Sequence, residues 1–259
     1  MFVSVFDMFK IGIGPSSSHT MGPMVAANNF LELMRSSPFN FAGVRCRLHG
    51  SLAFTGVGHA TDRAITLGLE GFTPENYDEV KASKALSRIQ STHFLEPDGL
   101  GKLKFNTSED LIFDYGPRLD EHSNGLILYA IDHQGDVILE EIYFSIGGGF
   151  ILTKSEFSQQ SPNEIGTEVP YPFKTAAEML QMARSSGKSI AEMKRDNERA
   201  LHSNAEIKDG LSRIWKTMDM CIKRGLENDG QLPGGLNVKR RAKGIYDALI
   251  SEKGKNLTP

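Results

Sequence analysis

The hydrophobic pattern of the chain is interrupted between residues 155 and 173, and this interruption constrains how the chain can fold. Hydrophobic periodicity stops there, and Ser, Gln, Asn and Gly gather around three prolines, Pro162, Pro170 and Pro172. Such a stretch is typical of a connection between domains, because proline and glycine break helices and strands. We therefore expect an α+β domain over residues 1–154, a linker over 155–173 and an all-helical segment over 174–259.

Strands and helices are mixed before this break. Val44, Cys46 and Leu48 alternate with polar residues, which is the period of a half-buried strand, and two apolar runs around Gly135 predict a hairpin. Helices are predicted over about 20–35, 59–69 and 77–92, and strands over 102–105, 111–115, 126–131 and 137–144. The elements do not alternate strictly, and this favours an α+β fold.

The segment after the break is helical throughout. Two helix starts have the spacing of a capping box, Thr175-x-x-Glu178 and Ser189-x-x-Glu192, and Gly187 lies between these helices as a C-terminal cap. The longest predicted helix, about 204–226, carries an apolar stripe, and a short helix follows at about 242–251. No partner layer for these apolar faces is evident, so the segment resembles the first piece of a larger helical domain. A small independent bundle is the alternative.

Charge and cysteine content narrow the possible partners. The net charge of −3 over 259 residues gives no reason to expect a nucleic acid or an anionic membrane as partner. No apolar run has membrane-spanning length and the start lacks the features of a signal peptide, so we expect a cytoplasmic protein. The two cysteines, Cys46 and Cys221, lie far apart and form neither a disulfide framework nor a metal ligand set, and we assign no metal ligand.

The run from Gly12 to Thr20 concentrates groups that suit a binding site. Glycines and a proline are followed by Ser16, Ser17, Ser18, His19 and Thr20, and an apolar-periodic segment then begins. The N-terminus of a helix presents unpaired N–H groups and a partial positive charge, which favour a carboxylate or phosphate. His19 adds a group that changes charge near neutral pH. With Thr20 as N-cap, Pro23 lies in the first turn of the helix, and Ser18 is the competing cap. The alternative is that the serines merely cap a helix and that His19 is a solvated loop residue.

A second run, Gly56 to Asp62, repeats this pattern. It places His59, Thr61 and Asp62 at a helix start, where Thr61 or Asp62 can cap the helix and a carboxylate can fix the tautomer of an imidazole. If both runs lie at one edge of the sheet, His19 and His59 converge on one ligand. The alternative is two ordinary capped helices with solvated histidines.

Two further features stand outside these runs. Asn197 shares a helix face with apolar residues, so it either anchors a loop or reaches a ligand, whereas Glu198 beside it is expected to be solvated. Three glycines, Gly147 to Gly149, follow an apolar strand without the spacing of a dinucleotide-binding loop, and we expect them at a sheet edge or domain contact.

Five motifs, in the same order, resemble the iron–sulfur-dependent bacterial L-serine dehydratases (L-serine ammonia-lyases), and the resemblance covers essentially the whole chain. The first, Ser4-Val5-Phe6-Asp7-Met8-Phe9-Lys10-Ile11-Gly12-Ile13-Gly14-Pro15-Ser16-Ser17-Ser18-His19-Thr20, is long and specific. The others are Gly58-His59-Ala60-Thr61-Asp62, Tyr143-Phe144-Ser145-Ile146-Gly147-Gly148-Gly149-Phe150, Pro170-Tyr171-Pro172-Phe173-Lys174, and Asn197-Glu198 followed by Ala200-Leu201-His202.

The resemblance implies a fold, a cofactor and a reaction. The N-terminal α+β domain would be similar to the substrate-binding regulatory domain of some phosphoglycerate dehydrogenases, and a following helical domain would supply cysteines for a [4Fe–4S] cluster. The reaction, a step of amino-acid degradation that feeds gluconeogenesis, would eliminate water from L-serine and end in pyruvate and ammonia. A Lewis-acidic iron would take the serine hydroxyl while a base removes the Cα proton.

The same resemblance implies roles for residues. Ser16, Ser17, Ser18 and Thr20 would hold the substrate carboxylate, His19 or His59 would act as base or orienting group, and Thr61, Asp62 and Asn197 would assist in binding. Family members are commonly dimeric, so a homodimer is possible. Ala60 departs from the pattern, since some relatives are expected to carry another histidine there.

The cluster cysteines of the family lie in a part that this chain lacks. We therefore expect a fragment, a truncated product or one chain of a split enzyme, inactive without a cysteine-bearing polypeptide. A non-catalytic serine-binding regulatory module is the alternative. A pyridoxal-phosphate enzyme is a weaker one, because no lysine has the setting of a Schiff base beside a phosphate-binding glycine loop.

Overall fold

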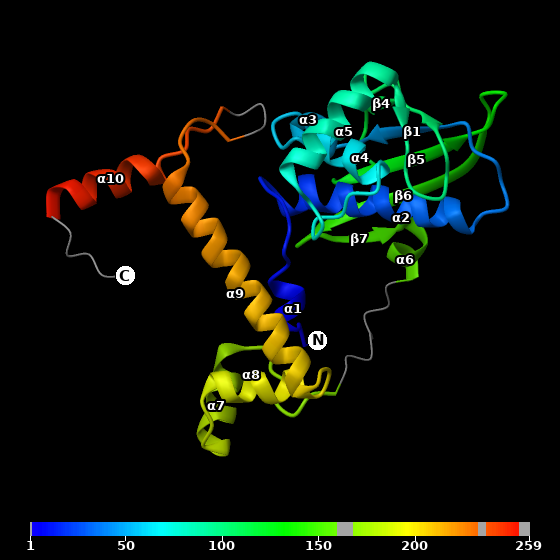
Figure 1. Ribbon diagram of the computed structural model, residues 1–259. Coiled ribbons are helices and arrows are strands. Elements are labelled where there is room, and N and C mark those ends of the chain that lie inside the picture. Colours follow the sequence, from blue (N-terminus) through cyan, green and yellow to red (C-terminus); the bar gives the residue numbers. More distant parts are fainter. Residues whose placement is uncertain (1, 160–167, 233–236, 254–259) are drawn as a thin grey trace. The chain divides into compact units, whose positions relative to one another are not determined.

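The computed structural model describes residues 2–159, 168–232 and 237–253, which form two compact units. The sheet unit is built on residues 12–159. The helical unit is built on residues 168–230, together with the N-terminal residues up to Ile11 and the C-terminal residues from Lys239. Figure 1 labels the elements of both units, each of which is described by itself below.

A twisted sheet organises the first unit. Its strands are β1 (Gly43–Leu48), β2 (Phe94–Leu95), β3 (Leu103–Lys104), β4 (Leu111–Phe113), β5 (Gly125–Ile131), β6 (Val137–Gly147) and β7 (Phe150–Thr153). Their order is β2-β3-β1-β5-β6-β7, and β4 also pairs with β1. β5 is antiparallel to both β1 and β6, whereas β4 is parallel to β1. β1, β4 and β6 therefore run in one direction and end at the same edge of the sheet.

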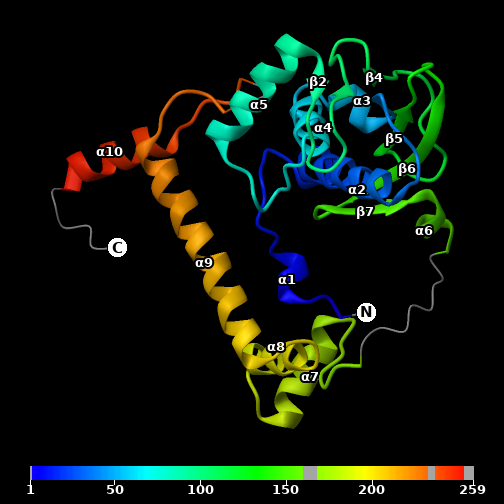
Figure 2. The same cartoon turned by 45° about the vertical axis from the view of Figure 1, so that its right-hand side comes forward.

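Helices cover one face of this sheet. They are α2 (Gly22–Ser36), α3 (Ser51–Thr55), α4 (Thr61–Leu69) and α5 (Glu79–Thr92), while the short α6 (Lys154–Gln159) packs on β6 and β7. α2 packs on β5, β6 and β7, α4 packs on α2, and α5 packs on α4 (Figures 1 and 2). Gly68 permits the close approach of α4 to α2, because a Cβ there would lie 2.6 Å from the carbonyl oxygen of Met24.

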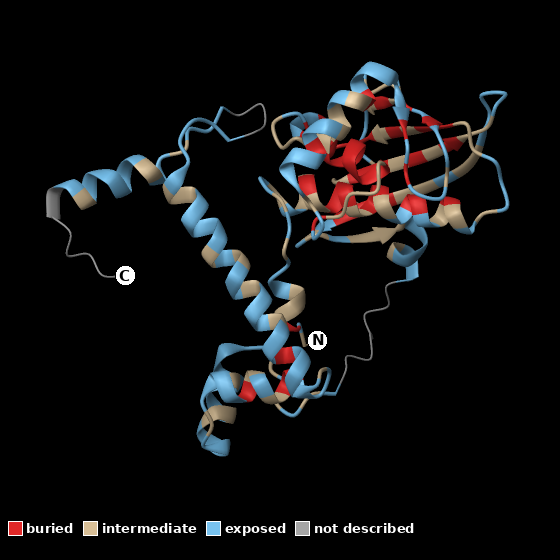
Figure 3. Cartoon of the chain, viewed as in Figure 1, coloured by how far each residue is buried: buried red, intermediate tan, exposed pale blue. Residues whose placement is uncertain are grey.

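The hydrophobic core lies between α2 and the sheet. Val44, Cys46 and Leu48 of β1 are fully buried, as are Phe30 and Leu31 of α2. Burying side chains of this size contributes roughly 1.5–3 kcal/mol each. Buried residues are concentrated in the sheet unit (Figure 3).

The helical unit is formed by short and long amphipathic helices. They are α1 (Val5–Met8), α7 (Ala176–Ser186), α8 (Ile190–Arg199), α9 (Asn204–Glu227) and α10 (Ala242–Lys253). Three capping boxes start α7, α8 and α9, at Thr175, Ser189 and Ser203, and Gly187 ends α7 in the left-handed conformation. Among the described side chains of α9, only Ile207 is buried. Large apolar side chains of α9 and α10 stay exposed, namely Leu211, Trp215, Met218, Met220, Ile222, Ile245, Tyr246 and Leu249.

Most elements predicted from the sequence are confirmed, with some corrections. The β5–β6 hairpin, the helices, and the two capping boxes agree with expectation. Residues 154–159 form α6 where we expected the linker to begin, and residues 160–167 of that linker lie outside the described residues. No helix within the described part of the chain is both long and apolar enough to cross a bilayer.

Candidate active site

The run from Gly12 to Thr20 leads into a single turn of π-helix, Ser17–Met21, that continues directly into α2. The Ser16 side chain caps this turn by accepting a hydrogen bond from the His19 N–H at 3.2 Å. The prediction that Thr20 or Ser18 is the cap is therefore wrong. The wide π-turn arises because the Met21 N–H donates to the Ser16 carbonyl five residues earlier, at 3.2 Å. Single π-turns are frequent at functional sites.

Serines hold both ring nitrogens of His19. Nδ1 lies 2.8 Å from Ser18 Oγ, and Nε2 lies 2.8 Å from Ser51 Oγ at the start of α3. Burial lowers the pKa of His19, and the neighbouring His59 lowers it further. The ring is consequently biased towards its neutral form. A serine hydroxyl can donate or accept, so this environment suits either tautomer.

His59 lies against His19, as the sequence pattern predicted for converging turns. The two ring centroids are 4.8 Å apart, with an interplanar angle of 35°. His59 Nδ1 lies 2.9 Å from the Thr55 carbonyl oxygen. A carbonyl only accepts, so Nδ1 carries the proton and the lone pair of a neutral ring stays on Nε2. Within the described part of the chain, no hydrogen bond reaches that Nε2 atom.

Two threonines cross-link the histidine turns. Thr20 Oγ1 donates to the His59 carbonyl at 2.8 Å, and Thr61 Oγ1 donates to the His19 carbonyl at 2.5 Å. Both threonines are buried. Each hydroxyl thus fixes the backbone of the opposite histidine, and this reciprocal pair explains why the two rings are held together.

The remaining polar residues of the turns are placed differently from expectation. Ala60, in the left-handed conformation at φ 53°, is the N-cap of α4, so the prediction that Thr61 or Asp62 caps this helix is wrong. Asp62 lies in the first turn of α4, and its carboxylate forms no hydrogen bond or ion pair with either histidine. The Thr55 carbonyl fixes the tautomer of His59 instead. Ser17 is exposed, and Ser16 and Ser18 are half-buried beside His19.

Asn197, the last predicted binding residue, lies in the helical unit. It is fully buried, and its amide both accepts from the Tyr171 N–H and donates to the Tyr171 carbonyl, each at 2.8 Å. Both polar atoms of its side chain are thus engaged by one loop residue, which corresponds to the loop-anchoring alternative. A contact of Asn197 with substrate stays a prediction.

Glu198 corrects another expectation. It was expected to be solvated, yet it is 3% exposed. Its carboxylate accepts from Ser4 Oγ at 2.8 Å and from the Val5 N–H at 2.6 Å. Phe6 follows and packs edge-on against His202, with centroids 5.2 Å apart. These contacts explain why the N-terminal residues group with the helices and not with the sheet.

Ser51 is a site residue that sequence reasoning missed, and Ser145 lies beside the end of the π-turn. Ser51 touches His19 only because β1 ends beside the π-turn, and no local motif marks it. Ser145 is fully buried with an unpartnered hydroxyl, and it lies directly against Gly22, so that a side chain at Gly22 would collide with it. Gly147, Gly148 and Gly149 all have positive φ and form the turn from β6 to β7.

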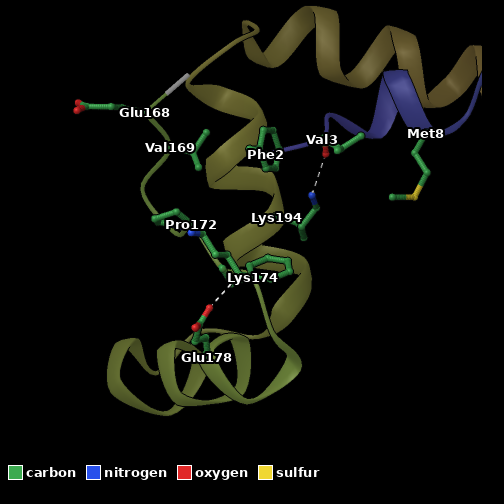
Figure 4. Close-up of a pocket in the computed structure, with 10 residues that line it drawn as sticks. Phe2, Val3, Met8, Glu168, Val169, Pro172, Lys174, Glu178 and Lys194 are labelled. Carbon is green, nitrogen blue, oxygen red and sulfur yellow. Dashed lines mark hydrogen bonds between the residues drawn. The ribbon is translucent and has the colours of Figure 1, made fainter. Parts of the chain in front are cut away.

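The described residues do not provide a metal centre. They contain no group of three or more His, Cys, Asp or Glu side chains arranged to hold a metal ion. Cys46 is buried in β1, where burial strongly raises the pKa of its thiol, and Cys221 is exposed on α9. A cavity of about 880 Å³ is found in the helical unit, lined by Phe2, Val3, Pro172 and Lys194 among others (Figure 4), but it contains neither histidine.

Comparisons with known proteins identify relatives over nearly the whole chain. A family model described as serine dehydratase beta chain matches residues 4–156. An L-serine dehydratase of Streptomyces coelicolor is 41% identical over 254 residues, which are 97% of this chain and 56% of that relative. An L-serine dehydratase of Haemophilus influenzae is 39% identical over 95% of this chain and 54% of the relative. L-serine dehydratase 1 of Escherichia coli is 39% identical over 96% of this chain and 55% of the relative. The chain thus spans little more than half the length of these relatives.

Proposed function

This chain belongs to the serine dehydratase beta chain family, and we propose on that premise that it supplies the substrate-binding part of an L-serine dehydratase. The reaction removes the Cα proton and the hydroxyl of L-serine as water and leaves aminoacrylate. Aminoacrylate then takes up water and gives pyruvate and ammonia. Because the Cα proton is weakly acidic, the chain must present a base with a free lone pair.

The orientation of His59 carries this proposal. Its Nδ1–H is committed to the Thr55 carbonyl at 2.9 Å, so Nε2 is the atom that can accept a proton. We assign the base to His59 Nε2. Burial lowers the pKa of the neighbouring His19, whose ring centroid lies 4.8 Å from that of His59, so the base works beside a ring that is biased towards its neutral form.

The π-turn provides a place for the substrate carboxylate. Ser17 and Ser18 open a helical run of 20 residues that continues through α2, and the first amide groups of a helix have no acceptor one turn earlier. These N–H groups and the Ser18 hydroxyl lie on the same turn as His19. A carboxylate bound there is held beside the imidazole pair. Thr20 and Thr61 position the two histidines through their bonds to the main chain.

A [4Fe–4S] cluster, which the family resemblance implies, does not fit the described residues, because Cys46 is buried in the core and Cys221 stands alone. The cysteine ligands belong, in this proposal, to the part of the relatives that lies outside the match. We extend the proposal to the fold of the sheet unit, which we expect to be similar to the substrate-binding regulatory domain of phosphoglycerate dehydrogenases.

Ammonia release from L-serine under anaerobic conditions tests the function. The chain is assayed alone and with the region of the Streptomyces coelicolor relative that lies outside the match, produced as a separate polypeptide and reconstituted with iron and sulfide. We expect ammonia only from the mixture. His59→Gln should lower kcat at least about 100-fold, as loss of a general base does. His133→Gln, in the exposed β5–β6 turn, is the matched control and should leave kcat unchanged.

Three outcomes would each overturn part of the proposal. Turnover by the chain alone in iron-free buffer would show that it is complete as a catalyst. Full activity of His59→Gln in the mixture would show that His59 is not the base. If the mixture is silent while L-serine still raises the melting temperature of the chain, the protein is a serine-binding module without catalytic function.

A further inference from the structure

Three strand ends bring exposed apolar side chains to the edge of the sheet that carries the histidines. β1, β4 and β6 run in one direction and finish there. Phe54 and Val57 follow β1, Tyr115 follows β4, and Ile146 and Phe150 flank the turn that ends β6. We call these five residues the apolar collar. The topology, and not any local motif, gathers them at one edge.

The collar residues stay exposed although they are large and apolar. Phe54 is 64% exposed, Tyr115 60% and Val57 57%, and Ile146 and Phe150 are about 40% exposed. The rings of Phe54 and Tyr115 pack against each other with centroids 5.3 Å apart. A preformed aromatic pair loses little conformational freedom on binding, and aromatic residues are enriched in the centres of protein interfaces. The collar therefore has the character of an interface.

The collar borders the histidines on both sides. On one side, Phe54 is followed by Thr55, whose carbonyl accepts the His59 Nδ1–H. On the other side, Ser145 packs against Gly22 and Gly149 lies against Met21, at the end of the π-turn that carries His19. A macromolecule that covers the histidine pair from this edge of the sheet therefore lies next to the apolar collar.

We infer that the apolar collar is the docking surface for the polypeptide region that the relatives possess outside the match. The inference rests on the proposed function and adds where that region binds. The region outside the match makes up about 44–46% of each relative, since the match covers 54–56% of its length. In the proposed function that region supplies the cluster cysteines and acts on the same substrate as the histidines, so it has to lie close to them. Apolar side chains of the region cover the collar and exclude water from the His59 Nε2 atom.

The test measures binding of the separate Streptomyces coelicolor polypeptide to the full chain by isothermal titration calorimetry. Phe54→Ser combined with Tyr115→Ser should weaken binding at least tenfold, as loss of aromatic anchors does. Val57→Ser is a second, smaller probe of the same surface and should weaken binding in the same direction. The control combines Phe39→Ser with Val137→Ser. These residues are 50% and 48% exposed at the opposite end of the sheet unit, and binding should be unchanged.

The outcomes separate this inference from the proposed function. Equal binding by the collar and control variants would overturn the collar as docking surface, even if the mixture is active. Absence of binding to the unmodified chain would overturn the inference, while L-serine binding to that chain, measured separately by NMR, would keep the substrate-binding part of the proposal. If sedimentation shows a homodimer that only the collar variants disrupt, the occupant is a second copy and the inference is wrong.

Discussion

At the scale of single residues, two histidines lie in surroundings that disfavour their charged form. His19 belongs to the candidate site, and His49 directly follows β1. His49 is 8% exposed, and among the described residues neither of its ring nitrogens makes a hydrogen bond of good geometry, although the Pro117 backbone lies close enough to raise its pKa slightly. Burial lowers its pKa, and the Asp114 carboxylate, 3.9 Å from Nδ1, offsets this only in part.

These lowered pKa values predict a loss of stability in mild acid. In the unfolded chain both histidines titrate near pH 6.5, whereas in the folded chain they bind protons only at lower pH. The contribution of the two neutral histidines to the free energy of unfolding is therefore fully present above about pH 6.5. It is lost as the pH drops from there towards the folded pKa values. Each histidine contributes at most about 1.4 kcal/mol per pH unit to this slope.

The measurement is the free energy of unfolding between pH 7.5 and 5. His49→Gln should flatten the slope below pH 6.5, because the variant has no imidazole to protonate. His133→Gln, at an exposed position, should leave the slope as it is. A slope that is equally steep in His49→Gln would show that burial of His49 does not cause the acid sensitivity.

At the scale of elements, local signals predicted what local interactions determine. The capping boxes at Thr175 and Ser189 were predicted correctly because each needs only four consecutive residues. The π-turn was not, since its wide Ser16–Met21 bond depends on packing of the turn against the sheet. Ser51 was missed for the same reason: its contact with His19 joins residues 32 apart in sequence.

The attachment of α1 to α8 is the largest departure from expectation at this scale. Ser4 and Glu198 are 194 residues apart in sequence, and no pattern in either segment predicts their hydrogen bond. Around it, the Lys194 ammonium lies 4.1 Å from the centre of the Phe2 ring, and Gly210 leaves room for the Phe6 ring. A buried carboxylate with two donors therefore secures the N-terminal residues to the helical unit.

Removal of this carboxylate should free the N-terminal segment. Glu198→Ala leaves the Ser4 hydroxyl and the Val5 N–H without an acceptor, at a cost of about 2 kcal/mol. Hydrogen exchange of the Met8 and Phe9 amides, which are bonded within α1, should accelerate at least tenfold. Glu227→Ala, at the exposed end of α9, is the control. Unchanged exchange in Glu198→Ala would show that the surrounding aromatic contacts suffice.

At the scale of the whole molecule, the two units differ in how completely they bury apolar surface. The sheet unit has a continuous core between α2 and the strands. The α9 helix instead exposes Trp215 at 63% and Ile222 at 57%. An amphipathic helix gains most of its stability from packing its apolar face, so an uncovered stripe of this length indicates a missing partner layer. That the helical segment begins a larger helical domain stays a prediction.

Trp215 can report on that layer, because it is the only tryptophan in the chain. If the region of the relatives outside the match covers α9, its addition should bury the indole, shift the Trp215 emission to shorter wavelength and reduce quenching by iodide. The added polypeptide must have its own tryptophans replaced by phenylalanine, and Trp215→Phe should abolish the signal.

Collar variants test docking at the sheet unit, whereas Trp215 tests packing at the helical unit. A change in Trp215 emission that persists in the Phe54→Ser, Tyr115→Ser variant would mean that α9 binds the polypeptide independently of the collar. An emission that stays that of an exposed indole, although calorimetry detects binding, would show that the α9 stripe is not part of the interface.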